Sequence, residues 1–335
     1  MSASRSWWVC VAVCVLWTAT SHRRPTTHHG TRDDNAHDRP GSGFYKALEV
    51  DGFSEDQGVT SRSMSLPVAL GHEHPIAMAH RGSGLLWPEN TMVAFQGAAD
   101  LGYRYLETDL QITRDGVLVT IHDDTVNRTT DGTGLVSDYS LQELQTLDAG
   151  YRFERDGDNP HRGRGIRVPT LEELAITYPD GVFTLDLKSD GMEAALVDLI
   201  RRLDLWDRVI VGSFSGSRLR RFRALVDRPV ATSAGPSEIL RFLAAARTHL
   251  PYRPRADSFQ VPVKDRGITI VNPRTVRAAR RLGIPLIVWT INHLAEMEGL
   301  LDLGVDGLIT DRPDLLRTLL AKRSRKPDWK EPLDG

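Results

Sequence analysis

Cysteine and net charge are both scarce in this chain of 335 residues. The two cysteines, Cys10 and Cys14, lie within the first fifteen residues, so the rest of the chain offers no disulfide and no thiol nucleophile. The net charge of −2 gives no overall field toward nucleic acid or an acidic membrane surface, and we expect no nucleic-acid partner. A G-x-S-x-G elbow and a P-loop are also missing, which excludes two further classes of enzyme.

The first 75 residues have no pattern of a folded domain. Residues 1–21 contain a basic residue, an apolar run at 7–17 and then small residues, which is the order of a secretory signal peptide. That run is shorter than the roughly 20 residues that cross a bilayer. Residues 22–75 are mostly polar, which predicts a disordered linker. We therefore expect a secreted or cell-envelope protein without a stable membrane span; a mis-assigned start codon is the alternative.

Short β-branched runs alternate with amphipathic stretches over residues 76–320. The candidate strands are Ile76–His80, Arg104–Leu110, Val117–His122, Val182–Lys188, Val209–Phe214, Pro229–Ser233, Ser258–Val263, Leu286–Ile291 and Gly307–Thr310. The helical patterns between them include Met92–Leu101, Met192–Leu203, Ser237–Ala246, Pro273–Leu282, Leu294–Leu303 and Pro313–Leu320. Such alternation predicts a parallel α/β architecture.

A TIM (β/α)8 barrel accounts best for this number of strands and helices. Nine candidates are one more than a barrel needs, so we expect one to be a loop or an extra short strand, and Pro229–Ser233 is the weakest. Residues 124–169 interrupt the alternation and predict a small insertion after the third strand, helical only at Leu141–Leu147. Residues 321–335 form a charged tail. A doubly wound open sheet is the alternative, although no glycine-rich fingerprint follows the first strand.

Ionisable side chains recur where the candidate strands end. Glu107 and Asp109 are two residues apart on a strand, so their carboxylates leave the same face. With Asp186 from another strand, they make three hard oxygen donors suited to Ca²⁺ or Mg²⁺. The alternative is a set of carboxylates in ion pairs with Arg81 or Lys188.

Two histidines, His80 and His122, end nearby strands, and imidazole is the usual group for proton transfer near neutral pH. On the same rim, Arg81 and Lys188 offer cations for a phosphate group. Together with a metal ion, these groups describe a site that hydrolyses a phosphate ester.

Two further residues accompany this set. Glu89, just before the first predicted helix, has the position to orient Arg81. Trp289, at the end of a late strand, either stacks on the alcohol part of a substrate or fills the top of the barrel.

At these residues the chain resembles the glycerophosphodiester phosphodiesterase family. The resemblance covers about 76–320 and rests on an ordered set of short motifs: His80-Arg81-Gly82, Pro88-Glu89-Asn90-Thr91, Glu107-Thr108-Asp109, His122-Asp123, Arg128-Thr129-Thr130, Pro169-Thr170-Leu171, Ser213-Phe214, Trp289-Thr290-Ile291-Asn292 and Thr310-Asp311-Arg312-Pro313. It implies a TIM barrel that hydrolyses glycerophosphodiesters to sn-glycerol 3-phosphate and an alcohol.

The resemblance also implies a role for each site residue. His80 and His122 take the places of the acid and base, Glu107, Asp109 and Asp186 those of the metal ligands, and Arg81 and Lys188 those of the phosphate-binding cations. Asp186 departs from the family, which usually has glutamate there, so direct ligation by this shorter side chain is the least secure of these roles.

Two other functions stay open. A related barrel cleaves lysophospholipids or forms a cyclic phosphate, and a large apolar rim would favour it. A barrel that only binds its ligand, without turnover, would have no chemical reason to keep both histidines beside Glu107 and Asp109.

Overall fold

The computed structural model describes residues 66–71, 75–248 and 250–323. The predicted signal peptide at 1–21, most of the predicted linker at 22–75 and most of the tail at 321–335 lie outside the described residues. Within the described ranges, no helix has both the length and the apolar character that crossing a membrane requires.

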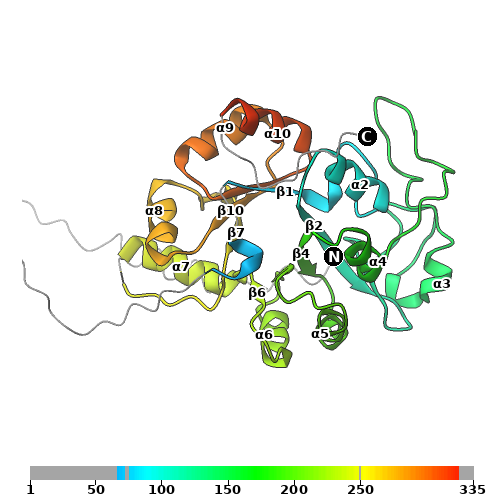
Figure 1. Cartoon of the computed structure of the whole chain (residues 1–335), viewed down its shortest axis with the longest axis horizontal. Coiled ribbons are helices and arrows are strands. Elements are labelled where there is room, and N and C mark those ends of the chain that lie inside the picture. The colour runs from blue at the N-terminus through cyan, green and yellow to red at the C-terminus, as the bar shows by residue number, and fades with distance from the viewer. Residues whose placement is uncertain (1–65, 72–74, 249, 324–335) are drawn as a thin grey trace, which may run out of the picture. The chain divides into compact units, whose positions relative to one another are not determined.

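Eight parallel strands form the centre of the described part of the chain (Figure 1). They are β1 (Ile76–Ala79), β2 (Tyr105–Ile112), β4 (Val182–Leu187), β5 (Val209–Gly212), β6 (Ala231–Thr232), β7 (Phe259–Pro262), β10 (Leu286–Trp289) and β11 (Gly307–Thr310). Their order is β6-β5-β4-β2-β1-β11-β10-β7, and a parallel bridge from Ser233 to Ser258 joins the two outer strands. This closure confirms the predicted (β/α)8 barrel and excludes the open sheet.

A helix follows each barrel strand, and Figure 1 shows these helices one after another around the strands. They are α2 (Met92–Asp100), α4 (Leu171–Thr177), α5 (Glu193–Arg202), α6 (Gly216–Leu225), α7 (Pro236–Thr248), α8 (Pro273–Leu282), α9 (Leu294–Leu303) and α10 (Pro313–Lys322). Side chains cap their first turns: the Thr91 hydroxyl accepts from the Ala94 amide, and Asn272 accepts from the amides of Arg274 and Thr275. Of these helices, α4 and α6 are additional to those we predicted.

The extra strand is not the one we considered weakest. β3 (Leu118–Thr120), within the candidate Val117–His122, pairs antiparallel with the last residues of β2 and lies off the barrel. The weak candidate Pro229–Ser233 contains β6, which has only two residues but belongs to the barrel. β2 has eight residues, twice as many as β1, so its end projects past the barrel and is left for β3 to pair with.

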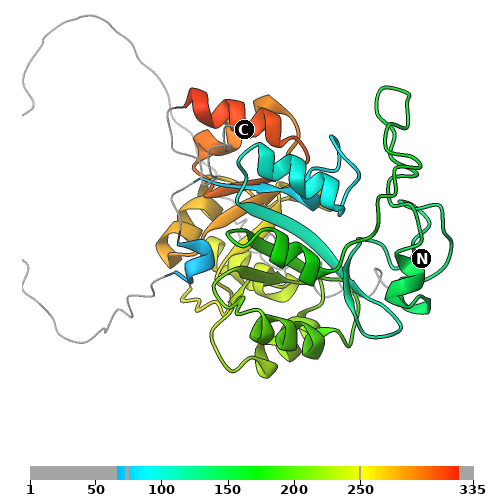
Figure 2. The ribbon, with the colours of Figure 1, turned by 45° about the vertical axis from the view of Figure 1, so that its right-hand side comes forward.

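The segment 124–169 lies between β3 and α4 and contains η3 (Val136–Asp138) and α3 (Leu141–Leu144). In Figure 2 it lies on one side of the barrel, and the loop after α3 projects outward. A small core of its own holds it together, formed by Val119, Ile121, Val126, Val136, Leu144, Ala149, Ile166 and Val168. Burial of these side chains gives the insertion a fixed base at the barrel rim.

A short helix closes the amino end of the barrel. η1 (Val68–Leu70) lies in the stretch that we assigned to the linker, yet Ala69 and Leu70 are fully buried. The Tyr105 hydroxyl, inside the barrel, donates a hydrogen bond of 3.1 Å to the Ala69 carbonyl. The folded part therefore begins before residue 76. At the other end, β8 (Lys264–Asp265) and β9 (Ile268–Thr269) form a hairpin after β7.

Candidate active site

The barrel interior changes from apolar to polar along the strands. Its amino half is filled by Ile76, Met78, Tyr105, Val182, Ile210, Ala231, Ile287 and Ile309, against η1. Side chains on a strand alternate between its two faces, so the residues that follow on the inner face are polar: His80 after Met78, Glu107 after Tyr105 and Asp311 after Ile309. The polar groups therefore collect at the carboxyl end of the strands, where barrel enzymes carry their active sites.

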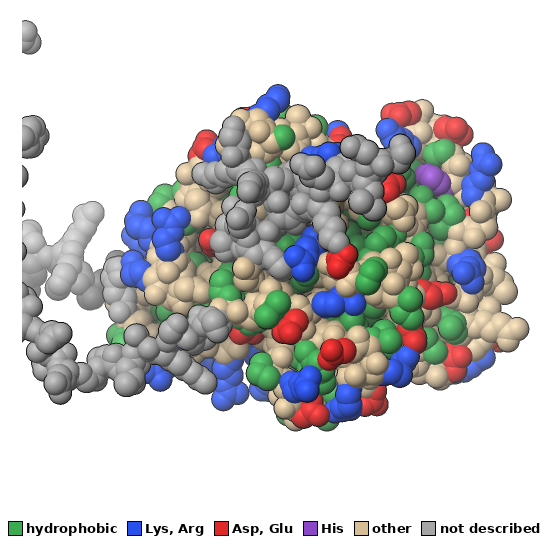
Figure 3. Space-filling view, in the orientation of Figure 1, with side chains coloured by type: hydrophobic (Ala, Val, Ile, Leu, Met, Phe, Trp, Pro, Cys, Tyr) green, Lys and Arg blue, Asp and Glu red, His purple; other side chains and the backbone are tan. Residues whose placement is uncertain are grey.

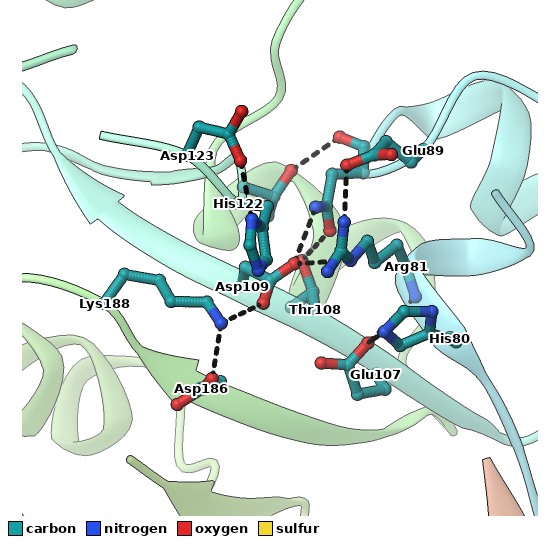
Figure 4. A network of polar contacts seen from close by, with 12 residues as sticks. His80, Arg81, Glu89, Glu107, Thr108, Asp109, His122, Asp123, Asp186 and Lys188 are labelled. Atoms are coloured by element: carbon teal, nitrogen blue, oxygen red, sulfur yellow. Dashed lines mark hydrogen bonds and ion pairs between the residues drawn. The ribbon is translucent and has the colours of Figure 1, made fainter. Parts of the chain in front are cut away.

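The three predicted metal ligands lie together, but two cations stand between them (Figure 4). Asp109 and Asp186 are register partners on neighbouring strands. Lys188 Nζ lies 2.9 Å from Asp109 Oδ1 and 2.6 Å from Asp186 Oδ2, and Arg81 Nε lies 3.0 Å from Asp109 Oδ2. The ion pairs that the sequence analysis offered as an alternative to a metal site are therefore present.

Burial and charge shift the pKa values of these carboxylates in different directions. Burial tends to raise the pKa of Asp109, but Lys188 and Arg81 outweigh it and lower that pKa. For Glu107, burial and the charge of Asp109 raise the pKa to about 7. Burial also raises the pKa of Asp186, although Lys188 opposes the change. The site thus holds more negative charge than Arg81 and Lys188 neutralise.

These carboxylates fit a divalent cation in their chemistry. Asp186 Oδ1 is buried without a hydrogen-bond partner among the described residues, and Glu107 has the raised pKa of a carboxylate short of positive charge. Both oxygens of Asp109 are engaged, and nowhere in the described ranges do three His, Cys, Asp or Glu side chains stand as a ready metal cage. Glu107 and Asp186 therefore offer the free hard oxygens that Ca²⁺ or Mg²⁺ prefers.

His80 is held from both sides. It opens η2 (His80–Gly82) directly after β1, and its Nδ1 lies 2.8 Å from Asp311 Oδ1. Asp311 is fixed in turn by the Asn292 side-chain amide, which donates to its Oδ2 at 3.0 Å. His80 Nε2 lies 3.9 Å from Glu107 Oε2. Burial tends to lower the pKa of His80, but Glu107 and Asp311 together raise it.

Arg81 is fixed by its backbone and its side chain. Its φ of 52° turns its amide toward Glu107, to which it donates a hydrogen bond of 2.9 Å. Its guanidinium donates to Glu89 Oε1 at 2.9 Å, so the structure places Glu89 where the sequence analysis expected it. Asn90 donates to Asp109 Oδ2 at 3.0 Å and accepts from the Thr108 hydroxyl, which ties the loop after β1 to β2.

His122 reaches the rim by a route that we did not predict. It follows β3 rather than a barrel strand, and the antiparallel return of β3 along β2 brings it back beside Asp109 (Figure 4). The Ile121 amide donates to the Asp109 carbonyl at 3.0 Å and sets this position. His122 Nδ1 then lies 2.7 Å from Asp123 Oδ1.

An arginine from the insertion joins both halves of the site. Arg128 donates hydrogen bonds of 2.7 to 3.2 Å to both oxygens of Asp123 and of 2.7 and 2.8 Å to both oxygens of Glu89. Burial tends to raise the pKa of Asp123, but Arg128 and His122 lower it to about 2. One guanidinium therefore links the carboxylate beside His122 to the carboxylate beside Arg81.

Three residues were missing from the predicted site: Asp123, Asp311 and Arg128. Asp123 and Asp311 end a strand like the residues we did select, and each follows another polar residue, so strand position alone marks them as candidates. Arg128 has no such signal, because only the folding of the insertion brings it to the rim.

Trp289 packs against the apolar interior and is partly buried, so it does fill the top of the barrel. Its ring meets Phe214 edge to face, with centroids 5.7 Å apart. Phe214 is 62% exposed at the end of β5, and Lys188 Nζ lies 5.5 Å from its ring centroid. The site therefore has an apolar wall next to one of its cations.

Taken together, the rim offers two imidazoles whose Nδ1 atoms face carboxylates, which turns their Nε2 atoms the other way. It also offers two cations for an anion and carboxylates for a metal ion. Such groups can bind a phosphate ester and move protons to and from its oxygens.

The family model described as "Glycerophosphoryl diester phosphodiesterase family" matches residues 80–315. A probable glycerophosphodiester phosphodiesterase 2 of Mycobacterium tuberculosis is 39% identical over 264 residues, which cover 76% of this chain and 94% of that one.

Two solved structures have the same fold. A glycerophosphodiester phosphodiesterase from Agrobacterium tumefaciens is 27% identical, with a TM-score of 0.59 over 72% of this chain and 99% of its own. A phosphodiesterase from Oleispira antarctica, solved in complex with the product sn-glycerol-3-phosphate, is 24% identical, with a TM-score of 0.59 over 74% of this chain and 97% of its own.

Proposed function

The chain belongs to the glycerophosphoryl diester phosphodiesterase family, and on that premise we propose that it hydrolyses glycerophosphodiesters to sn-glycerol 3-phosphate and an alcohol, with His80 and His122 transferring the protons and a divalent metal ion assisting. One observation carries this proposal: each histidine pairs through Nδ1 with a carboxylate, at one rim, beside Arg81 and Lys188.

The two cations take the phosphate group. Arg81 is anchored through its amide and through Glu89, so its guanidinium is fixed before the substrate arrives. Lys188 is protonated at any physiological pH, because Asp186 and Asp109 raise its pKa against the effect of burial. Fixed positive charges that already surround the phosphoryl oxygens stabilise the additional charge of the transition state.

The protons move through the imidazoles. Asp311 and Glu107 raise the pKa of His80, which makes His80 the donor to the departing alkoxide oxygen. His122, held by Asp123, then accepts the proton of the attacking water. The carboxylate on each Nδ1 fixes the tautomer and the direction of the ring.

Glu107, Asp109 and Asp186 would hold the metal ion, Ca²⁺ or Mg²⁺. When bound, the ion supplies positive charge that polarises the phosphoryl oxygens. Asp186, one methylene shorter than the usual glutamate, still presents an oxygen without a partner among the described residues.

A second candidate is the cleavage of lysophospholipids or the formation of a cyclic phosphate. The exposed Phe214 beside Trp289 favours it, because an apolar wall next to Lys188 can accept part of an acyl chain. The product sn-glycerol 3-phosphate is in turn supported by the Oleispira antarctica enzyme, which was solved with that molecule.

A substrate comparison tests the proposal. The protein is incubated with glycerophosphocholine, glycerophosphoethanolamine and lysophosphatidylcholine, each with EDTA and again after Ca²⁺ or Mg²⁺ is restored, and phosphorus NMR identifies the products. We expect a phosphomonoester from the first two substrates, no reaction in EDTA and recovery with metal. A cyclic phosphate or preferred cleavage of lysophosphatidylcholine would establish the second candidate, and no turnover of any substrate would indicate a binding barrel.

We also propose an extracytoplasmic location, on the composition of residues 1–21. Expression of the full chain with fractionation and N-terminal sequencing tests it. A cytoplasmic product that keeps these residues would contradict it.

A further inference from the structure

Exposed arginines gather on one side of the barrel, over α7, α8 and the loop between α7 and β7. In Figure 3, basic side chains form a group at the left, where Figure 1 places α8. The set, which we call the basic α7–α8 face, comprises Arg241, Arg247, Arg253, Arg255, Arg274, Arg277, Arg280 and Arg281. Each is exposed, and none forms an ion pair with an acidic side chain of the described residues.

Arginines elsewhere on the surface are mostly paired. On α5, Arg201 lies 3.0 Å from Asp198 and 3.2 Å from Asp227, and Arg202 pairs with Glu172. On α6, Arg221 lies 2.6 Å from Asp190. Unpaired arginine is therefore a property of the α7–α8 side and not of the surface in general.

The local charge differs sharply from that of the whole chain. Residues 236–282 contain ten basic and three acidic residues, a net charge of +7, whereas the chain as a whole has −2. Two of the three acids are engaged elsewhere: Glu238 bonds to Arg223 of α6, and Asp257 accepts from the Thr232 amide. The overall charge therefore conceals a strongly positive region that the sequence analysis did not detect.

The arginines of α8 are arranged to act together. Arg274, Arg277 and Arg281 have the spacing of one helix face, whereas Val276 and Ala279 are buried on the other. Three guanidinium groups side by side without acids repel one another by a few tenths of a kcal/mol per pair. A surface that retains this repulsion is suited to an anionic partner, and guanidinium binds phosphate oxygens in pairs.

Apolar side chains distinguish among anionic partners. Leu240 is 41% exposed on α7 next to Arg241, and Leu250 is 66% exposed between Arg247 and Arg253. Nucleic acids and soluble polyanions gain little from exposed leucine, whereas a bilayer surface binds basic and apolar side chains together. We propose that the basic α7–α8 face docks the protein on bilayers that contain anionic phospholipids. This proposal does not depend on the proposed function.

Vesicle binding by the full chain tests the proposal. Vesicles of phosphatidylcholine alone and of phosphatidylcholine with phosphatidylglycerol are mixed with the protein at low and at physiological salt, and bound protein is measured by flotation. We expect binding that requires phosphatidylglycerol and weakens with salt. An unaltered protein that ignores phosphatidylglycerol at low salt would overturn the proposal.

Matched variants locate the docking surface. Arg274→Gln, Arg277→Gln and Arg281→Gln together should weaken binding by on the order of 100-fold, from the contribution of each basic residue near an anionic surface. The control replaces three exposed arginines elsewhere, Arg155→Gln, Arg164→Gln and Arg220→Gln, and should change binding less than threefold, about what non-specific loss of charge produces. The N-terminal apolar segment is common to both variants and cannot cause a difference. Equal binding by both would overturn the proposal.

A third variant separates lipid from other polyanions. Leu240→Ser with Leu250→Ser should weaken vesicle binding several-fold and leave retention on heparin unchanged. If vesicle binding is unaffected while heparin competes fully, the partner is a soluble polyanion and the membrane assignment is wrong. Hydrolysis of a soluble substrate should be equal in all variants, which confirms that each is folded.

Discussion

The two halves of the barrel interior are made from the same strands and are opposite in chemistry. The amino half is lined by aliphatic side chains and Tyr105, almost all of them fully buried, and η1 closes it. The carboxyl half holds Glu107 and Asp109, at 7% and 2% exposure, and the cations that face them. Burying an aliphatic side chain stabilises a fold by about 1.5–3 kcal/mol, whereas a buried carboxylate lowers stability unless it is fully compensated.

The comparison teaches where stability and chemistry reside. The pKa of Glu107, raised to about 7, shows that the carboxyl half is not fully compensated. The charged layer therefore depends on the apolar layer beneath it for its position. Changes in the upper layer should alter activity far more than stability, and changes in the lower layer should do the reverse.

The largest expected effect is the loss of a histidine from the upper layer. His80→Ala and His122→Ala should each lower kcat/KM by about 1,000-fold, the contribution typical of a proton-transferring group. The melting temperature should change by only about 2 °C, because neither side chain belongs to the apolar core. Steady-state assays and thermal denaturation measure both. His161→Ala, in the insertion, is the control, and activity retained in either site variant would refute the acid–base roles.

The lower layer should respond in the opposite way. Ile76→Ala removes a fully buried side chain four residues before His80 and should lower the free energy of unfolding by about 3 kcal/mol. The activity of the folded fraction at 25 °C should stay within about twofold of the original, because the site is two layers away. Denaturant titration measures the first effect. The control Val68→Ala, at an exposed position, should cost less than about 0.5 kcal/mol.

A third variant should gain stability while it loses function. The pKa of Glu107 lies above its ordinary value of 4.5, so ionising it in the folded protein costs free energy that grows as pH rises from 4.5 to about 7 and is constant above. In EDTA at pH 8, Glu107→Gln should therefore be more stable by on the order of 1–3 kcal/mol. The gain should vanish below pH 4.5. Glu172→Gln, at the surface, should show no such gain, and a destabilised Glu107→Gln would contradict the pKa assignment.

Much of this arrangement could be predicted from the sequence because it is local. Apolar runs marked most of the barrel strands, and the residues at their ends marked His80, Glu107, Asp109 and Asp186. β6 was underrated because only Ala231 and Thr232 form it. The overall charge gave no indication of the basic α7–α8 face, because acids elsewhere in the chain balance it.

What the sequence does not contain is the set of contacts between distant segments. His122 reaches the rim because β3 turns back along β2, and strand periodicity cannot distinguish such a return from a barrel strand. Asp311 meets His80 across 231 residues of sequence. These pairings follow from the closure of the barrel, and only the folded chain shows them.

The smallest expected effect tests whether the insertion contributes to the upper layer. Arg128→Gln removes the link between Asp123 and Glu89, which frees both carboxylates to shift beside His122 and Arg81. We expect kcat to fall about tenfold, which equals 1.4 kcal/mol, with little change in KM, because the substrate-binding cations remain in place.

A structural effect alone would give a different pattern. Arg128→Lys should restore part of the activity, since it keeps one charge but not the four bonds, and the pH profile of kcat for Arg128→Gln should shift because Asp123 loses its main cation. Arg155→Gln, in the same insertion and paired only with its neighbour Asp156, serves as the control. If Arg128→Gln lowers the melting temperature and leaves the pH profile unchanged, the insertion merely supports the fold. A shifted profile at unchanged stability would show that the catalytic layer extends beyond the barrel strands into the insertion.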